Sequence, residues 1–132
     1  MEREYSLPHH QRLRSRGSIR RLFDSGKSGF VYPLRYIWFA EDSPEGEANQ
    51  AEVLFTVPKR FHKRANRRNL LRRYIKESYR LQKSIILDRE LLTEDRAKSI
   101  DIAIIYSTKE QKSYKNINNA VRKILENIAK DL

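Results

Sequence analysis

The segment from Pro58 to Lys83 constrains this chain more than any other, because dense positive charge and a helical apolar pattern coincide there. It holds eleven Lys and Arg residues and one acid, Glu77, and so contributes +10 to a net charge of +11. Charge of that density destabilises a compact chain through self-repulsion unless a polyanion meets it. Nucleic acid is such a polyanion, so the segment predicts binding to RNA or DNA.

The apolar residues of this segment predict a helix that is charged on one side. At about 100° per residue they fall within an arc of roughly 140°, which we expect to face the core. They are Leu70, Leu71, Tyr74, Ile75, Leu81 and Ile85. The opposite sector holds Asn69, Arg72, Arg73, Lys76, Arg80 and Lys83, with Arg68 and Tyr79 at its edge. Solvated helix faces usually mix the two signs, because like charges one turn apart repel, so this face indicates contact with phosphates.

The composition fits one small domain and excludes several kinds of site. With 132 residues, 39% of them hydrophobic, the chain is long enough for one modest core. It has no cysteine, which excludes disulfides and thiolate ligands and fits a reducing cytoplasm, the location we expect. No apolar run reaches the length of a membrane span or a secretory signal, so we expect no membrane partner.

Flanking patterns predict a mixture of helices and strands. We expect residues 1–17 to form a flexible basic arm and residues 18–132 to form a single domain. Ser18 is a candidate cap for a short helix that ends at Gly26. Alternation predicts strands at 34–40, 51–57 and 100–106, and the last two are apolar on both faces and therefore expected to be central. A helical stripe over 115–130, capped by Ser113, follows them.

No group of residues predicts catalysis or metal binding by side chains of the protein. The histidines are expected to be solvated; they are His9, His10 and His62. The acids of interest lie on different predicted elements with no motif linking them; they are Asp24, Glu52, Glu77 and Asp101. None of the four glycines has the spacing of a phosphate-binding loop. We therefore expect no catalytic residue, no metal ligand and no cofactor bound by the protein alone.

The basic segment resembles the protein subunit of bacterial ribonuclease P, whose helix carries an R-N-R-x-K-R signature after a basic loop. Arg68 and Asn69 match the first two signature positions, and Arg72 and Arg73 match the later basic pair. The loop and the continuation of the helix are matched by Lys59, Arg60, Lys63, Arg64, Ala65, Lys76, Glu77, Tyr79 and Arg80. The chain departs from the pattern at Leu70, where the family usually has Arg, and at Pro58, where a small residue often stands.

This resemblance implies a fold and a function. The fold is α+β, an α/β sandwich with a small mixed sheet in the order α-β-β-(β)-α-β-α, including a left-handed β-α-β crossover. The implied function is that of an accessory subunit of an endoribonuclease, which binds a catalytic RNA and the 5′ leader of precursor tRNA and helps to remove that leader. The chemistry then belongs to the RNA and its bound Mg²⁺. No protein partner is implied.

The resemblance also assigns two groups of binding residues. The catalytic RNA would be held by Lys59, Arg60, Lys63, Arg64, Arg68, Asn69, Arg72, Arg73, Lys76 and Arg80. The leader would be bound by Arg12, Arg16, Ile19, Phe23, and Tyr36 or Trp38. Core packing is an equally good interpretation of Tyr36 and Trp38, and a hydrogen bond to nearby backbone is an alternative for Asn69.

Two rival functions fit part of the pattern. A structural RNA-binding module, such as a small ribosomal protein, would share the charge, the size and the mixture of helix and strand. A helix-turn-helix DNA regulator would need a helix and a tight turn before the basic helix, where the sequence predicts a strand and a basic loop.

Overall fold

A four-stranded mixed sheet forms the centre of the computed structural model, which describes residues 11–13, 15–42, 49–87 and 98–132. The elements run in the order α1 (Arg16–Ser25), β1 (Lys27–Val31), β2 (Leu34–Asp42), β3 (Gln50–Thr56), α2 (Ala65–Gln82), α3 (Ser84–Leu87), β4 (Lys98–Tyr106) and α4 (Tyr114–Asp131). The strands lie in the order β1-β2-β4-β3, and β3 and β4 are parallel neighbours joined through α2 and α3. The predicted α+β class is confirmed.

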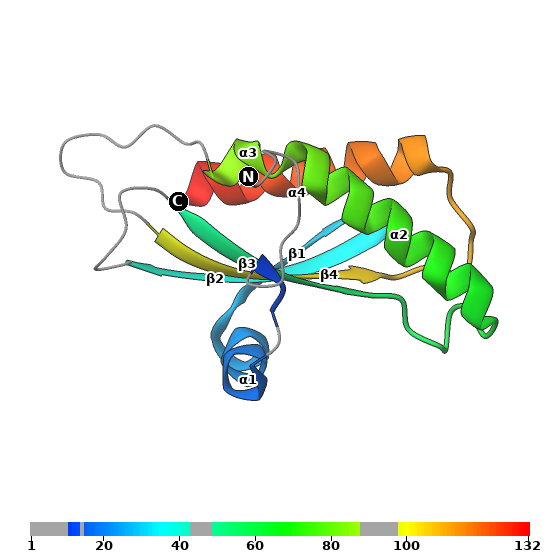
Figure 1. Cartoon of the computed structure of the whole chain (residues 1–132), viewed down its shortest axis with the longest axis horizontal. Coiled ribbons are helices and arrows are strands. Elements are labelled where there is room, and N and C mark those ends of the chain that lie inside the picture. The colour runs from blue at the N-terminus through cyan, green and yellow to red at the C-terminus, as the bar shows by residue number, and fades with distance from the viewer. Residues whose placement is uncertain (1–10, 14, 43–48, 88–97) are drawn as a thin grey trace, which may run out of the picture.

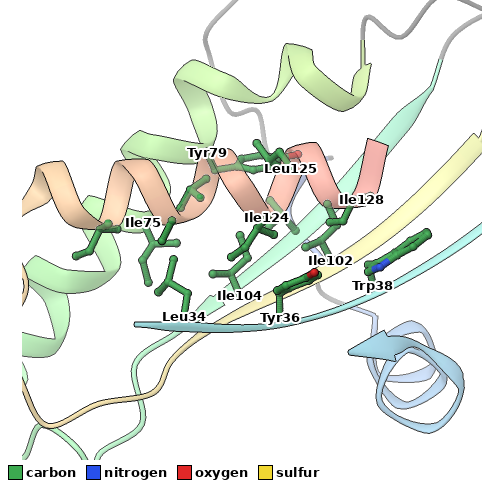
Figure 2. Packing of buried hydrophobic residues seen from close by; sticks show 14 of the residues in the cluster. Leu34, Tyr36, Trp38, Ile75, Tyr79, Ile102, Ile104, Ile124, Leu125 and Ile128 are labelled. Atoms are coloured by element: carbon green, nitrogen blue, oxygen red, sulfur yellow. The ribbon is translucent and has the colours of Figure 1, made fainter. Parts of the chain in front are cut away.

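The helices cover the two faces of the sheet unequally. Figure 1 shows α2, α3 and α4 together on one face and α1 alone on the other, where it is seen nearly end-on and so crosses the strands. The main core lies under the three helices. Its members include Leu34, Tyr36, Trp38, Ile75, Tyr79, Ile102, Ile104, Ile124, Leu125 and Ile128 (Figure 2).

Helix α4 forms where the periodicity predicted it. The hydroxyl of Ser113 accepts a hydrogen bond from the backbone N–H of Asn116 at 3.2 Å, which caps the helix as expected. The apolar stripe faces the sheet and α2, and all its members are buried: Ile117, Ala120, Val121, Ile124, Leu125 and Ile128.

Strand β3 lies at an edge of the sheet, so the predicted central position is wrong for it and right for β4. Both faces of β3 are nevertheless covered. The backbone N–H of Leu13 donates to the carbonyl oxygen of Val53 at 2.9 Å, and Arg12 forms a parallel bridge with the same residue. Leu13 is buried against Leu54 on the α1 face, whereas Val53 packs in the main core. Both faces of β3 are therefore apolar because the main core covers one and Leu13 covers the other, although β3 does not lie between two strands of the sheet.

Helix α1 begins earlier than predicted. Ser15, not Ser18, caps it, with the Ser15 hydroxyl accepting from the Ser18 N–H at 3.4 Å. The boundary predicted at residue 17 is also wrong, because Leu13 is buried and Arg16 is already helical. The end at Gly26 is confirmed: its N–H donates to the Leu22 carbonyl oxygen at 2.8 Å.

A buried asparagine joins two elements at the end of the sheet where β4 begins. The side-chain amide of Asn49 donates to the carbonyl oxygen of Ile86 at 2.9 Å, and its oxygen accepts from the backbone N–H of Lys98 at 2.8 Å. One side chain therefore fixes the end of α3 relative to the start of β4. The connection between them, residues 88–97, lies outside the described residues.

Candidate nucleic-acid interface

The charged side of α2 points away from the core. Leu71, Ile75, Ser78 and Tyr79 are the buried residues of this helix. On a helical wheel drawn at about 100° per residue, Arg72 and Arg73 mark the two edges of a polar sector that spans roughly 100°. We call this set the cationic flank: Asn69, Arg72, Arg73, Lys76 and Arg80, all exposed or half-buried.

Two residues of α2 lie on sides that the helical wheel did not predict. Tyr79 is fully buried with its ring edge-to-face on Phe55 at 5.7 Å, whereas Leu81 is 42% exposed. The reason is that α2 packs on β3 through Tyr79 and on α4 through Tyr74, so the buried arc is rotated away from Leu81.

Lys83 was predicted on the charged sector and is buried instead. Its ammonium donates to the side-chain oxygen of Gln11 at 2.8 Å, so this cation serves the packing of residues before α1. The cationic flank therefore ends at Arg80.

The basic loop before α2 is held by a buried histidine. The Nε2 atom of His62 lies 2.9 Å from the carbonyl oxygen of Thr108, and its ring packs edge-to-face on Tyr106 at 5.3 Å. The prediction of a solvated side chain is wrong for His62, while His9 and His10 lie outside the described residues. Because the loop is anchored from inside, its cations face solvent: Lys59, Arg60, Lys63 and Arg64 are all exposed.

Arg68 and Asn69 organise the cations around them. The Nη1 atom of Arg68 donates to the carbonyl oxygens of His62 and Lys63, at 3.0 and 2.6 Å. The side-chain oxygen of Asn69 accepts from Arg72 at 3.0 Å, instead of bonding to nearby backbone as the alternative had it. Arg68 thus fixes the loop against the helix, and Asn69 orients a guanidinium of the cationic flank.

The single acid of α2 stays ionised beside the flank. Glu77 accepts from Arg80 at 2.8 Å, and this hydrogen bond lowers the pKa of Glu77 and raises that of Arg80. One carboxylate therefore lies near three cations of the flank, Arg73, Lys76 and Arg80. A surface of this kind attracts phosphates without reading bases.

A second candidate surface lies beside α1. Leu22 points to the sheet, and helical spacing places Ile19 and Phe23 on one side of it and Arg21 on the other. Phe23 is 48% exposed, Ile19 is half-buried, and Arg16 is exposed at the first turn. Exposed aromatic rings beside Arg can bind unpaired nucleotides.

Comparison with known proteins identifies the family. The model described as Ribonuclease P matches residues 7–129. This chain belongs to the Ribonuclease P family. The ribonuclease P protein component of Porphyromonas gingivalis is 30% identical over 125 residues, which cover 95% of this chain and 88% of that one. That of Chlorobaculum tepidum is 33% identical over 90 residues, which cover 64% of this chain and 56% of that one.

Solved ribonuclease P proteins share the fold. The RNase P protein of Staphylococcus aureus has a TM-score of 0.62 at 20% identity, covering 89% of this chain and 94% of that one. The RNase P protein from Thermotoga maritima has a TM-score of 0.64 at 22% identity, covering 88% and 96%. The predicted family and its sandwich of helices on a mixed sheet are both confirmed.

Two residues predicted for the ribonuclease P leader site point into the core. Tyr36 and Trp38 are 7% and 6% exposed, and Figure 2 shows both on the face of the sheet that carries α4. The alternative of core packing is therefore right for both. Successive residues of a strand face opposite sides, so Ile37 and Phe39 lie on the α1 face, where they pack with Leu22. Neither residue was predicted for this site, because the sequence of β2 does not show which of its two faces α1 covers.

Leu70 stands where the ribonuclease P signature usually has Arg, and it lies away from the cationic flank. It is half-buried and lies about 200° from Arg72 around α2, on the same side as Tyr74. The cationic flank therefore has no counterpart of the usual third signature cation.

The described residues contain no group of three His, Asp or Glu side chains arranged to hold a metal ion. Within the same residues, no helix has both the length and the apolarity that crossing a bilayer demands.

Proposed function

We propose that this chain, as a protein component of ribonuclease P, holds the catalytic RNA of that enzyme on the cationic flank of α2 and on the basic loop. The observation that carries the proposal is the one-sided charge of α2, in which Arg72, Arg73 and Lys76 share an outward face with a single carboxylate beside them. Arg can place two hydrogen bonds on one phosphate, and Lys acts as a point charge.

The loop cations extend this contact because Arg68 and His62 hold them in place. If six of the cations each neutralise one phosphate, the logarithm of affinity falls with the logarithm of salt concentration with a slope of about −4 to −5. The RNA with its magnesium ions supplies the metal-activated water for hydrolysis, and the side chains of this chain bind and orient.

The candidate surface beside α1 receives the 5′ leader of precursor tRNA in this proposal. Phe23 offers an exposed ring and Ile19 an apolar neighbour for unpaired bases, and Arg16 and Arg12 are exposed cations near the same helix. Leader binding would raise the affinity for precursor over mature tRNA and so help removal of the leader. We place this processing in the cytoplasm.

A reconstitution tests the function. The chain is added to its cognate ribonuclease P RNA with precursor tRNA at low magnesium, and release of the 5′ leader is followed. We expect faster cleavage with the chain than with RNA alone, and less stimulation by Arg72→Glu with Arg73→Glu. Unchanged cleavage would contradict the proposal and favour a structural RNA-binding module such as a ribosomal protein.

A competition experiment separates the third possibility, a DNA regulator. Before α2 the structure has β3 and the basic loop in place of the first helix of a helix-turn-helix. We therefore expect structured RNA to displace duplex DNA from the chain at fixed salt. The reverse preference would contradict the proposal.

A further inference from the structure

The face of the sheet that carries α1 has two halves of different charge. Arg21, on the side of α1 away from Phe23, lies 3.5 Å from Asp101 and 3.3 Å from Glu41. Glu52 pairs with Asp101 across β3 and β4, so its side chain lies on the same face. Among the described residues, two carboxylates thus contact the Arg21 guanidinium where β2 ends, and a third, Glu52, lies on the same face beside Asp101.

The other half of this face is apolar and cationic. Arg35 lies two residues along β2 from Ile37, about 7 Å, and on the same face. Phe30 of β1 and Ile105 of β4 are its direct neighbours in register. Figure 1 shows no helix over this half, which extends from α1 toward the N-terminal end of α2. Arg35 is exposed, and Phe30, at 57%, is the most exposed large apolar side chain of the described residues.

The ring of Phe30 contacts a neighbouring ring, Tyr32, that is itself anchored. It meets Tyr32 edge-to-face at 6.3 Å, and the ammonium of Lys112 lies 5.0 Å from the centre of the Tyr32 ring. The Tyr32 hydroxyl donates to Glu110 at 2.6 Å. An exposed ring that is fixed in this way loses little conformational entropy when a flat ligand stacks on it.

The same contacts connect the β1–β2 turn to the basic loop. Tyr32 lies 3.5 Å from the hydroxyl of Thr108, whose carbonyl oxygen lies 2.9 Å from His62 Nε2. The open half of the sheet and the loop cations therefore meet at one end of the molecule.

We infer that an unpaired RNA strand on the candidate surface beside α1 runs along β2 toward the β1–β2 turn, where Phe30 stacks on a base and Arg35 contacts a phosphate. The inference rests on the proposed function, since the strand is taken to be the leader. Helical spacing places Ile19 and Phe23 on the side of α1 that faces this half, because Arg21 faces the carboxylates. Those carboxylates repel phosphates, so the RNA strand should leave α1 over the other half of the sheet, toward Arg35 and Phe30.

The test uses the reconstituted holoenzyme and precursor tRNAs that differ only in leader length. Affinity is measured under conditions that prevent cleavage, for the wild type, Phe30→Ala, Arg35→Gln and Phe23→Ala. Tyr114→Ala, an exposed aromatic on α4, is the matched control. Phe30→Tyr tests rescue by another ring. Circular dichroism and urea unfolding establish that each variant folds.

We expect Phe23→Ala to lose affinity already with short leaders, and Phe30→Ala to lose roughly fivefold or more only with longer ones. Phe30→Tyr should restore that affinity. Arg35→Gln should reduce the salt slope by about 0.7 with long leaders alone. Tyr114→Ala should show no dependence on leader length.

Two results would overturn the inference, and they are distinguishable from failure of the proposed function. If Phe23→Ala depends on the leader but Phe30→Ala and Arg35→Gln lose nothing at any length, the strand takes another path and the proposed function stands. A loss with Phe30→Ala that is equal for mature tRNA would also overturn it. If even the effect of Phe23→Ala does not depend on the leader, the proposed leader site beside α1 is itself wrong.

Discussion

The Nη1 atom of Arg68 lies 2.6 Å from the carbonyl oxygen of Lys63, so a side chain of α2 holds the loop that leads into it. A second hydrogen bond, to His62, acts on the same loop from the same atom. Arg68, at the first signature position of the family, therefore stabilises the conformation of the basic loop in addition to carrying a positive charge.

We expect Arg68→Lys to weaken binding of the catalytic RNA although the charge is kept. A Lys ammonium cannot reproduce the geometry of the guanidinium, and hydrogen bonds of charged groups contribute about 1.5 to 3 kcal/mol. A loss of roughly tenfold in affinity, measured by filter binding, would follow. Arg73→Lys, at an exposed position of the flank, is the control and should lose less. Equal effects of the two substitutions would show that Arg68 acts by charge alone.

The double substitution Arg72→Glu with Arg73→Glu should weaken RNA binding by several kcal/mol and leave folding nearly unchanged. Both residues lie on the cationic flank away from the core, and exposed substitutions usually change stability by about 0.5 kcal/mol or less. Urea unfolding and RNA titration measure the two effects. The same change of charge in Arg122→Glu with Lys123→Glu, exposed on α4, is the control. Unfolding of the α2 variant with RNA affinity retained would mean that the flank is misplaced.

Tyr79→Phe should raise the free energy of unfolding by up to about 1 kcal/mol, because it removes a buried hydroxyl that has no hydrogen-bond partner in the described part of the chain. The matched substitution is Tyr106→Phe. That hydroxyl donates to the Glu110 carbonyl oxygen at 2.6 Å and accepts from the Lys112 N–H at 2.9 Å, so its removal should cost about 1 to 2 kcal/mol. Thermal unfolding compares them, and destabilisation by both would indicate a partner for Tyr79.

Asp101 should make the stability of the protein fall as pH rises through the acid range. Burial raises the pKa of Asp101 above its ordinary value of 3.8, against the opposing effect of the Arg21 hydrogen bond. The folded state therefore holds this proton more tightly than the unfolded state, and the associated stability is lost as pH rises from 3.8 through the raised pKa.

The substitution Asp101→Asn removes the titrating carboxyl group. The difference in unfolding free energy, variant minus wild type, should therefore increase as pH rises from about 3 to about 6. Urea unfolding across that range is the measurement, with Asp24→Asn, exposed on α1, as the control for loss of one charge. A difference that stays constant or declines with pH would contradict the prediction.

Local patterns predicted most of the helices and strands, because the spacing of apolar residues and the capping residue both lie within the element itself. The stripe of α4 and its cap at Ser113 needed no knowledge of neighbours. Strand β4 was apolar on both faces because it is central. The same pattern misplaced β3, since Leu13, distant in sequence, covers one of its faces.

The candidate site was predictable in charge but not in orientation. The cations of α2 follow from residue identity and helical spacing. The rotation that buries Tyr79 and exposes Leu81 depends on where β3 and α4 meet α2. Which residues of β2 face α1 depends on which face of the sheet that helix covers. The sequence of β2 alone does not show whether these are Tyr36 and Trp38 or Ile37 and Phe39.

Because the Asn49 carboxamide bonds to both Ile86 and Lys98, the chain positions flanking residues 88–97 are fixed to each other. They lie at the opposite end of β4 from Tyr106, which packs on His62 of the basic loop. A fluorophore or affinity tag inserted between these two anchored points would therefore lie about eight residues of strand, or roughly 26 Å, from the basic loop, and should leave the proposed RNA contact of that loop undisturbed.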